Sequence, residues 1–169
     1  NFVDAGGTTS SVYTVRAIIA AKELSPETAT VWGNNTRTIR LNRPSGGATP
    51  SGDNYTYAPG DSSVGDLDGD GDYELIVKWD PSNAHDNAHS GYTGNVLIDA
   101  YTFEGRQLWR IDLGRNIRAG AHYTQFQVFD FDGDGKAEIA MKTADGSKDG
   151  LGTVIGNAAA DHRNNNGYV

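Results

Sequence analysis

One short acidic motif occurs twice in this chain, and it constrains the fold more than any other feature. Residues 64–78 and 128–142 align without a gap at an offset of 64 residues, and both contain the spacing D-x-D-G-D-G-x-x-E. The two motifs hold nine of the 22 acidic residues, and without them the formal net charge of −8 would become +1. Carboxylates packed this densely repel one another unless a cation lies among them. The acidity of the chain is therefore concentrated in two loops.

Calcium is the cation that these ligands favour. It takes oxygen ligands from a tight turn, and the glycines of the motif permit such a turn. We therefore predict at least two calcium sites, each built from aspartates, one backbone carbonyl and a glutamate. The first site comprises Asp66, Asp68, Asp70, the carbonyl of Asp72, and Glu74, and the second comprises Asp130, Asp132, Asp134, the carbonyl of Lys136, and Glu138. The alternative is a solvated acidic turn without an ion.

The loops are not EF-hands. An EF-hand needs a bidentate glutamate at position 12 of the loop, where the first motif has Val77. The residues that follow each loop, 73–79 and 137–143, are apolar runs typical of strands rather than helices. Each loop is therefore expected to join two strands.

The spacing of the motifs predicts the fold class. Residues 95–103 and 106–113 form a predicted hairpin around a turn at Glu104 and Gly105. One repeat then contains about four strands, which is the content of a β-propeller blade. We expect an all-β protein in which residues 59–169 form about two blades, the second incomplete. Because open sheet edges are unfavourable, the chain is expected to be a piece of a longer protein or one of several associated chains.

Residues 1–58 are expected to be a separate β-rich segment and linker. Strands are predicted at residues 12–15 and 37–41, with one short helix over residues 17–24. Residues 44–52 are rich in Pro, Gly and Ser and are typical of a linker or long loop.

Composition excludes several classes of function. The chain has no cysteine, which excludes disulfides, thiolate metal sites and cysteine nucleophiles. It has no cluster of Lys and Arg of the kind that nucleic-acid binding requires. It also has no apolar run of about 18 residues, so no membrane partner is expected.

Several motifs resemble one known family. Residues 60–71, 78–83, 97–101, 108–126 and 140–146, taken in order, closely resemble the bacterial rhamnogalacturonan lyases of polysaccharide lyase family 11. The resemblance implies a secreted enzyme, a calcium-stabilised propeller of eight blades, and β-elimination in the galacturonate–rhamnose backbone of pectin, rhamnogalacturonan I. The runner-up function is a non-catalytic calcium-binding propeller that binds carbohydrate or protein.

The resemblance also implies roles for individual residues. It adds Asp61 to the ligands of the first calcium site. It places a sugar contact at Asp80 and another at Gly60, where the family is expected to have asparagine. The catalytic residues of the family match no position here, so no catalytic residue is assigned.

A basic cluster is a further candidate for polymer binding. Arg110, Arg115, Arg118 and His122 follow the predicted hairpin. Arg118 and His122 either contact an acidic polysaccharide or hold adjacent blades together. Lys78 and Lys142 occupy equivalent positions in the two repeats, which favours a structural role for both.

Calcium removal should destabilise the fold, because ligation of the two loops is coupled to folding. We expect a chelator to lower the melting temperature, measured by circular dichroism, and added calcium to restore it. An unchanged melting temperature after verified calcium removal would contradict the assignment of the loops.

Overall fold

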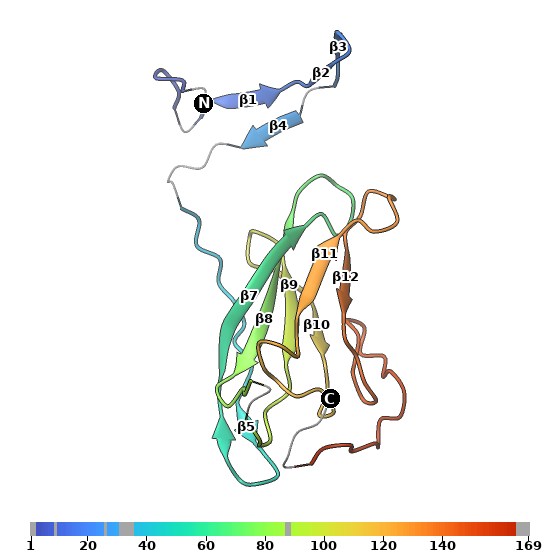
Figure 1. The fold of residues 1–169 in the computed structure, drawn as a ribbon. Helices are drawn as coiled ribbons and strands as arrows, with labels where there is room; N and C mark the ends of the chain where they lie inside the picture. The colour runs from blue at the N-terminus through green and yellow to red at the C-terminus, as the bar shows by residue number, and fades with distance from the viewer. Residues whose placement is uncertain (1–2, 9, 26, 31–35, 87–88, 165–169) are drawn as a thin grey trace. The chain divides into compact units, whose positions relative to one another are not determined.

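The computed structural model describes residues 3–8, 10–25, 27–30, 36–86 and 89–164 (Figure 1). The chain divides into two compact units, Asn1–Thr38 and Ile39–Val169. Every regular element in the described ranges is a β-strand, so the all-β prediction is confirmed. Within those ranges there is no helix with the length and apolar character that a bilayer crossing requires.

The first unit consists of short paired strands. Strand β1 (Val12–Val15) pairs antiparallel with β4 (Glu27–Thr30), which confirms the strand predicted at residues 12–15. Strands β2 (Ile18–Ile19) and β3 (Lys22–Glu23) form a hairpin in which Ala20 and Ala21 have φ of 49° and 61°. The helix expected over residues 17–24 is therefore wrong. Two β-branched isoleucines favour the strand, and both turn residues adopt the left-handed conformation of a tight hairpin.

The second unit is built on a four-stranded antiparallel sheet. Its strands follow one another in space as in sequence, in the order β10-β9-β8-β7 (Figure 1). They are β7 (Tyr57–Gly65), β8 (Glu74–Pro81), β9 (Leu97–Tyr101) and β10 (Gln107–Asp112). The predicted hairpin is confirmed in β9 and β10, whose turn contains Gly105 at a φ of 90°.

A second, two-stranded sheet begins where the motif recurs. Strands β11 (Phe126–Phe129) and β12 (Glu138–Met141) pair antiparallel around the second acidic loop. Strand β11 lies beside β7 (Figure 1). Each acidic loop therefore joins the first two strands of a sheet, as the sequence predicts. Among residues 143–164, only isolated bridges at Lys148 follow.

The alternating side chains of β8 separate two apolar clusters. On one face Ile76 packs with Ile98 and Leu113, and residues of the second sheet, including Val128 and Ile139, pack against them. The other face is a cluster of Tyr57, Val77, Trp79 and Tyr101. Because both faces are covered, the strand is apolar throughout most of its length rather than alternating.

The boundary between the units differs from the one predicted. Residues 39–58 belong to the second unit, and the chain divides after Thr38 rather than after residue 58. Leu41 and Tyr55 pack against the cluster on the second face of the sheet, so this stretch has a structural role. The predicted strand at residues 37–41 does not form, whereas β5 (Gly47–Ala48) and β6 (Asn54–Tyr55) lie where a linker was expected.

Asp99 organises this second face. Its carboxylate is completely buried and accepts hydrogen bonds from Trp79 Nε1 at 2.8 Å and from the Tyr101 hydroxyl at 2.7 Å. The Arg110 guanidinium donates to both carboxylate oxygens at 2.6 Å and also donates to the Asn42 carbonyl at 3.0 Å. Burial raises the pKa of Tyr101 to about 12, with a further contribution from its hydrogen bond to Asp99. The carboxylate thus joins three strands and the preceding segment.

Replacing Asp99 should destabilise the second unit strongly. In Asp99→Ala the buried N–H and O–H groups of Trp79 and Tyr101 lose their acceptor, and Arg110 loses its counter-ion. We expect a loss of about 3–5 kcal/mol in the free energy of unfolding, measured by denaturant titration. Asp53→Ala, on an exposed turn, is the control and should stay within about 0.5 kcal/mol of the parent. Equal stability of the two variants would contradict this role.

Candidate functional site

The two acidic loops have the same local structure. Asp66 accepts hydrogen bonds from the backbone N–H groups of Gly69 and Gly71 at 2.7 and 2.9 Å. Asp130 accepts the equivalent bonds from Gly133 and Gly135 at 2.7 and 3.0 Å. All four glycines have φ between 79° and 92°, a conformation that other residues rarely adopt.

The remaining loop contacts repeat in the same way. Glu74 accepts a bond from Leu67 N–H at 2.8 Å, and Glu138 accepts one from Phe131 N–H at 2.9 Å. The N–H groups of Asp72 and Lys136, whose carbonyls are the predicted ligands, donate to Asp70 and Asp134 at 2.8 Å in each case. The 64-residue repeat is therefore structural as well as sequential.

Each loop brings carboxylates close enough to share one ion. One oxygen from each of Asp66, Asp68 and Asp70 lies within 4.8 Å of the others, and so does one from each of Asp130, Asp132 and Glu138. Burial raises the pKa of Glu74, as do the charges of the first loop's aspartates, which outweigh its bond from Leu67. An oxygen-only donor set with this excess of negative charge fits calcium.

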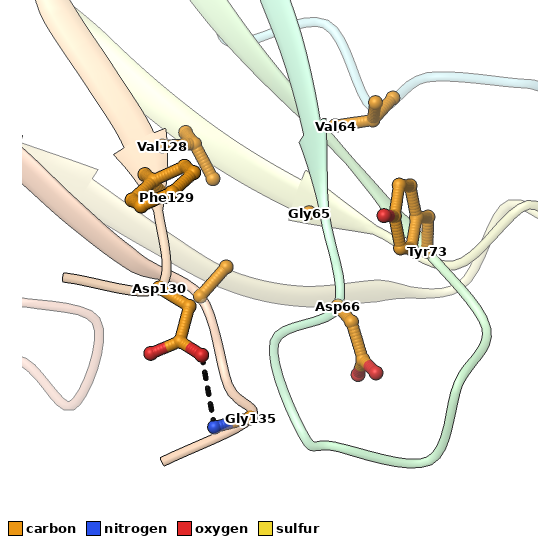
Figure 2. Close-up of a pocket in the computed structure, with 9 residues that line it drawn as sticks. Val64, Gly65, Asp66, Tyr73, Val128, Phe129, Asp130 and Gly135 are labelled. Atoms are coloured by element: carbon orange, nitrogen blue, oxygen red, sulfur yellow. Dashed lines mark hydrogen bonds between the residues drawn. The ribbon is translucent and has the colours of Figure 1, made fainter. Parts of the chain in front are cut away.

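The two loops also touch each other. Ala137 N–H donates to the Asp66 carbonyl at 2.6 Å. A Cβ atom on Gly65 would lie only 2.7–2.8 Å from side-chain atoms of Val128 and Ala137, so the strands can approach this closely only because residue 65 is glycine. A cavity of about 290 Å³ opens beside this contact, between Tyr73 and Phe129 (Figure 2). The carboxylates of Asp66 and Asp130 lie at its edge (Figure 2).

Asp61, the further calcium ligand that the family resemblance implies, lies elsewhere. It is on β7, where its carboxylate accepts a hydrogen bond from Lys78 Nζ at 2.5 Å. It belongs to neither group of carboxylates gathered in the described loops. The structure therefore gives Asp61 a different partner from the predicted one.

Asp80 lies beside the same lysine. Its carboxylate is 3.7 Å from Lys78 Nζ, and the lysine side chain is only 2% exposed. A Cβ atom on Gly60 would lie 2.0 Å from an Asp80 carboxylate oxygen, so the two predicted sugar contacts are neighbours. Burial raises the pKa of Asp80, and the charge of Lys78 opposes the shift. Lys78 is thus a buried counter-ion, which agrees with a structural role.

Arg118 is part of the interior. It is 1% exposed, and its guanidinium donates to the carbonyls of Gly91 and His89. Of the two roles considered for Arg118, the geometry favours the structural one, because the side chain holds the loop that follows β8. Burial and the charge of Arg118 lower the pKa of His85 in the same loop.

His122 is exposed and oriented. Its Nδ1 lies 2.5 Å from an Asp86 carboxylate oxygen, and its side chain is 62% exposed. Sequence reasoning named His122 but missed Asp86, because the pair is separated by 36 residues and no local spacing indicates it. It also missed Tyr73 and Phe129, which line the cavity as exposed apolar residues next to the motifs.

Comparisons with known proteins agree on one family. The family model for "Rhamnogalacturonan lyase family 11, C-terminal domain" matches residues 36–169. The chain is 62% identical to rhamnogalacturonan endolyase YesW and 61% identical to rhamnogalacturonan exolyase YesX, both of Bacillus subtilis. These alignments include the whole chain but only 27% and 28% of the relatives. The crystal structure of YesW superposes with a TM-score of 0.87 over 99% of this chain and 29% of that one.

Single substitutions should separate the two candidate metal centres. We expect Asp66→Ala and Asp130→Ala each to abolish or weaken one calcium site and to leave the other largely intact, because each loop has its own ligands. Isothermal titration with calcium would show the stoichiometry falling by one in each variant. Asp53→Ala, outside both loops, should bind as the parent does. Loss of both sites in either variant would contradict independent ligand sets.

Proposed function

The chain belongs to rhamnogalacturonan lyase family 11, and from this premise we propose that it is part of a calcium-binding rhamnogalacturonan lyase. The observation that carries the proposal is the match of residues 36–169 to the family, together with more than 60% identity to two lyases. The chain spans about a quarter of the length of these curated relatives. The proposed activity is therefore that of the complete polypeptide that carries this chain.

The fold we propose for that polypeptide is a β-propeller. Supporting it are the four-stranded meander, the start of a second sheet 64 residues later, and the close approach of β7 and β11. Adjacent blades of a propeller bring their first strands together in this way. The remaining blades, or associated copies, would cover the open edge of the second sheet.

We propose calcium as the ion of both loops. Their oxygen-only ligands, the repeated hydrogen bonds and the local excess of acid support it. Two ions would bring the formal charge from −8 to −4, which reduces repulsion from an acidic polysaccharide. When bound, calcium supplies charge neutralisation and holds the ends of paired strands.

The proposed reaction is β-elimination on a galacturonate residue. A base removes the proton on C5, which is acidified by the adjacent carboxylate, a double bond forms between C4 and C5, and the glycosidic oxygen leaves from C4. Stabilising the charge that develops at the carboxylate is the main electrostatic task. We propose that Asp80 binds a sugar hydroxyl, its carboxylate accepting the hydrogen bond. Lys78 holds that carboxylate in place from within the sheet.

We propose pectic rhamnogalacturonan I as the substrate and an extracellular location for the enzyme, since the polymer lies outside the bacterial cell. The chain is nearly equally identical to an endolyase and an exolyase. The features described here are therefore proposed to serve both modes of cleavage.

The test is an absorbance assay on the complete polypeptide. We expect rhamnogalacturonan to yield products that absorb ultraviolet light through the new C4–C5 double bond, with calcium present, and a chelator to suppress the signal. Polygalacturonate, which lacks rhamnose, is the substrate control. Binding of the polymer without unsaturated product would favour the alternative, a non-catalytic calcium-binding propeller.

A further inference from the structure

A turn that bears His122 departs from the repeat. At the offset of 64 residues, β7 (Tyr57–Gly65) corresponds to residues 121–129, but β11 begins only at Phe126. Residues 119–124 form a turn instead, in which the N–H groups of Tyr123 and Thr124 donate to the Gly120 carbonyl at 3.1 and 3.3 Å. The segment that would extend the strand is thus diverted.

The diverted turn packs against the loop that follows β8. The N–H of His85 donates to the Ala119 carbonyl at 3.0 Å, and Thr93 Oγ1 accepts from Ala119 N–H at 2.9 Å. A Cβ atom on Gly120 would lie 2.0 Å from the His85 carbonyl oxygen, so only glycine fits there. These contacts fix the backbone on both sides of His122.

The turn is close in sequence and in space to the proposed sugar contact. Asp80 is the penultimate residue of β8, and Asp86, the partner of His122, follows six residues later. In the repeat, Thr124 is the equivalent of Gly60, so His122 precedes by two residues the position that neighbours the sugar contact in the first sheet. The acidic loops lie at the opposite end of β8, beyond Glu74.

The surroundings of the imidazole are suited to an anion. Arg118 and Lys142 both face the ring of the adjacent Tyr123, with distances to its centroid of 5.7 and 5.5 Å. Asp86 holds Nδ1, which leaves Nε2 as the atom available to a ligand. A rigidly held imidazole of this kind binds with little loss of conformational freedom.

From this geometry we propose that His122, positioned by Asp86, forms a subsite next to Asp80 that binds a galacturonate carboxylate of the polymer. His122 contacts the sugar, and Asp86 is a positioning residue. The inference rests on the proposed function, because it needs a polyuronate as the substrate.

The test uses His122→Ala and Asp86→Asn in the complete polypeptide. We expect His122→Ala to raise KM about tenfold with kcat within about twofold, since the lost contact is made in the ground state and the transition state alike. Asp86→Asn should shift KM in the same direction but less. His162→Ala is the matched control, because His162 forms a second exposed imidazole–carboxylate pair, with Asp145 at 2.9 Å. It should leave KM unchanged.

A second measurement identifies the ligand group. A methyl-esterified rhamnogalacturonan fragment, tested as a competitive inhibitor, should have the same inhibition constant with the parent and with His122→Ala, whereas the free acid should lose about tenfold. An active parent with an unchanged KM in a folded His122→Ala variant would overturn the subsite and leave the proposed function intact. An equal rise in KM for His162→Ala would also overturn it, as a general effect of charge. A parent without unsaturated product would overturn the proposed function and the subsite with it.

Discussion

The buried carboxylate of Asp99 is the interaction on which the arrangement of the second unit depends. A carboxylate without access to water is stable only if its lone pairs are satisfied, and here an indole, a phenol and a guanidinium satisfy them. Because the donors come from β8, β9 and β10, these strands can have only one register. The Arg110 bond to the Asn42 carbonyl extends this constraint to residues that precede the sheet.

The end of the sheet that carries the acidic loops follows a different principle. There the polar groups are exposed, like-charged and close together, and backbone N–H groups satisfy only part of them. Such a loop is held by local hydrogen bonds but retains electrostatic repulsion. Stability at one end of the molecule thus comes from a satisfied interior network, and at the other end from whatever neutralises the loops.

The loops and their flanking strands could be predicted from sequence because their information is local. The duplicated motif specifies where the glycines and carboxylates lie, and the apolar runs after each loop specify strands β8 and β12. Pairs such as Asp86 with His122 could not be predicted, because 36 residues separate them and each looks like an ordinary surface residue. The role of residues 39–58 was missed for a related reason. Their Pro, Gly and Ser content is typical of a linker, whereas their function is to present Leu41 and Tyr55 to a distant cluster.

Gly65 has a consequence for the geometry of any larger assembly of such sheets. Its missing side chain allows Val128 and Ala137 to come into direct contact with the backbone of β7. In a ring of sheets, the spacing between first strands sets the angle through which each sheet is rotated from the last. A methyl group at this one position would widen that angular step, and small changes of step accumulate around a circle until it no longer closes. The size of one side chain at residue 65 therefore bears on the number of sheets that a closed ring can hold.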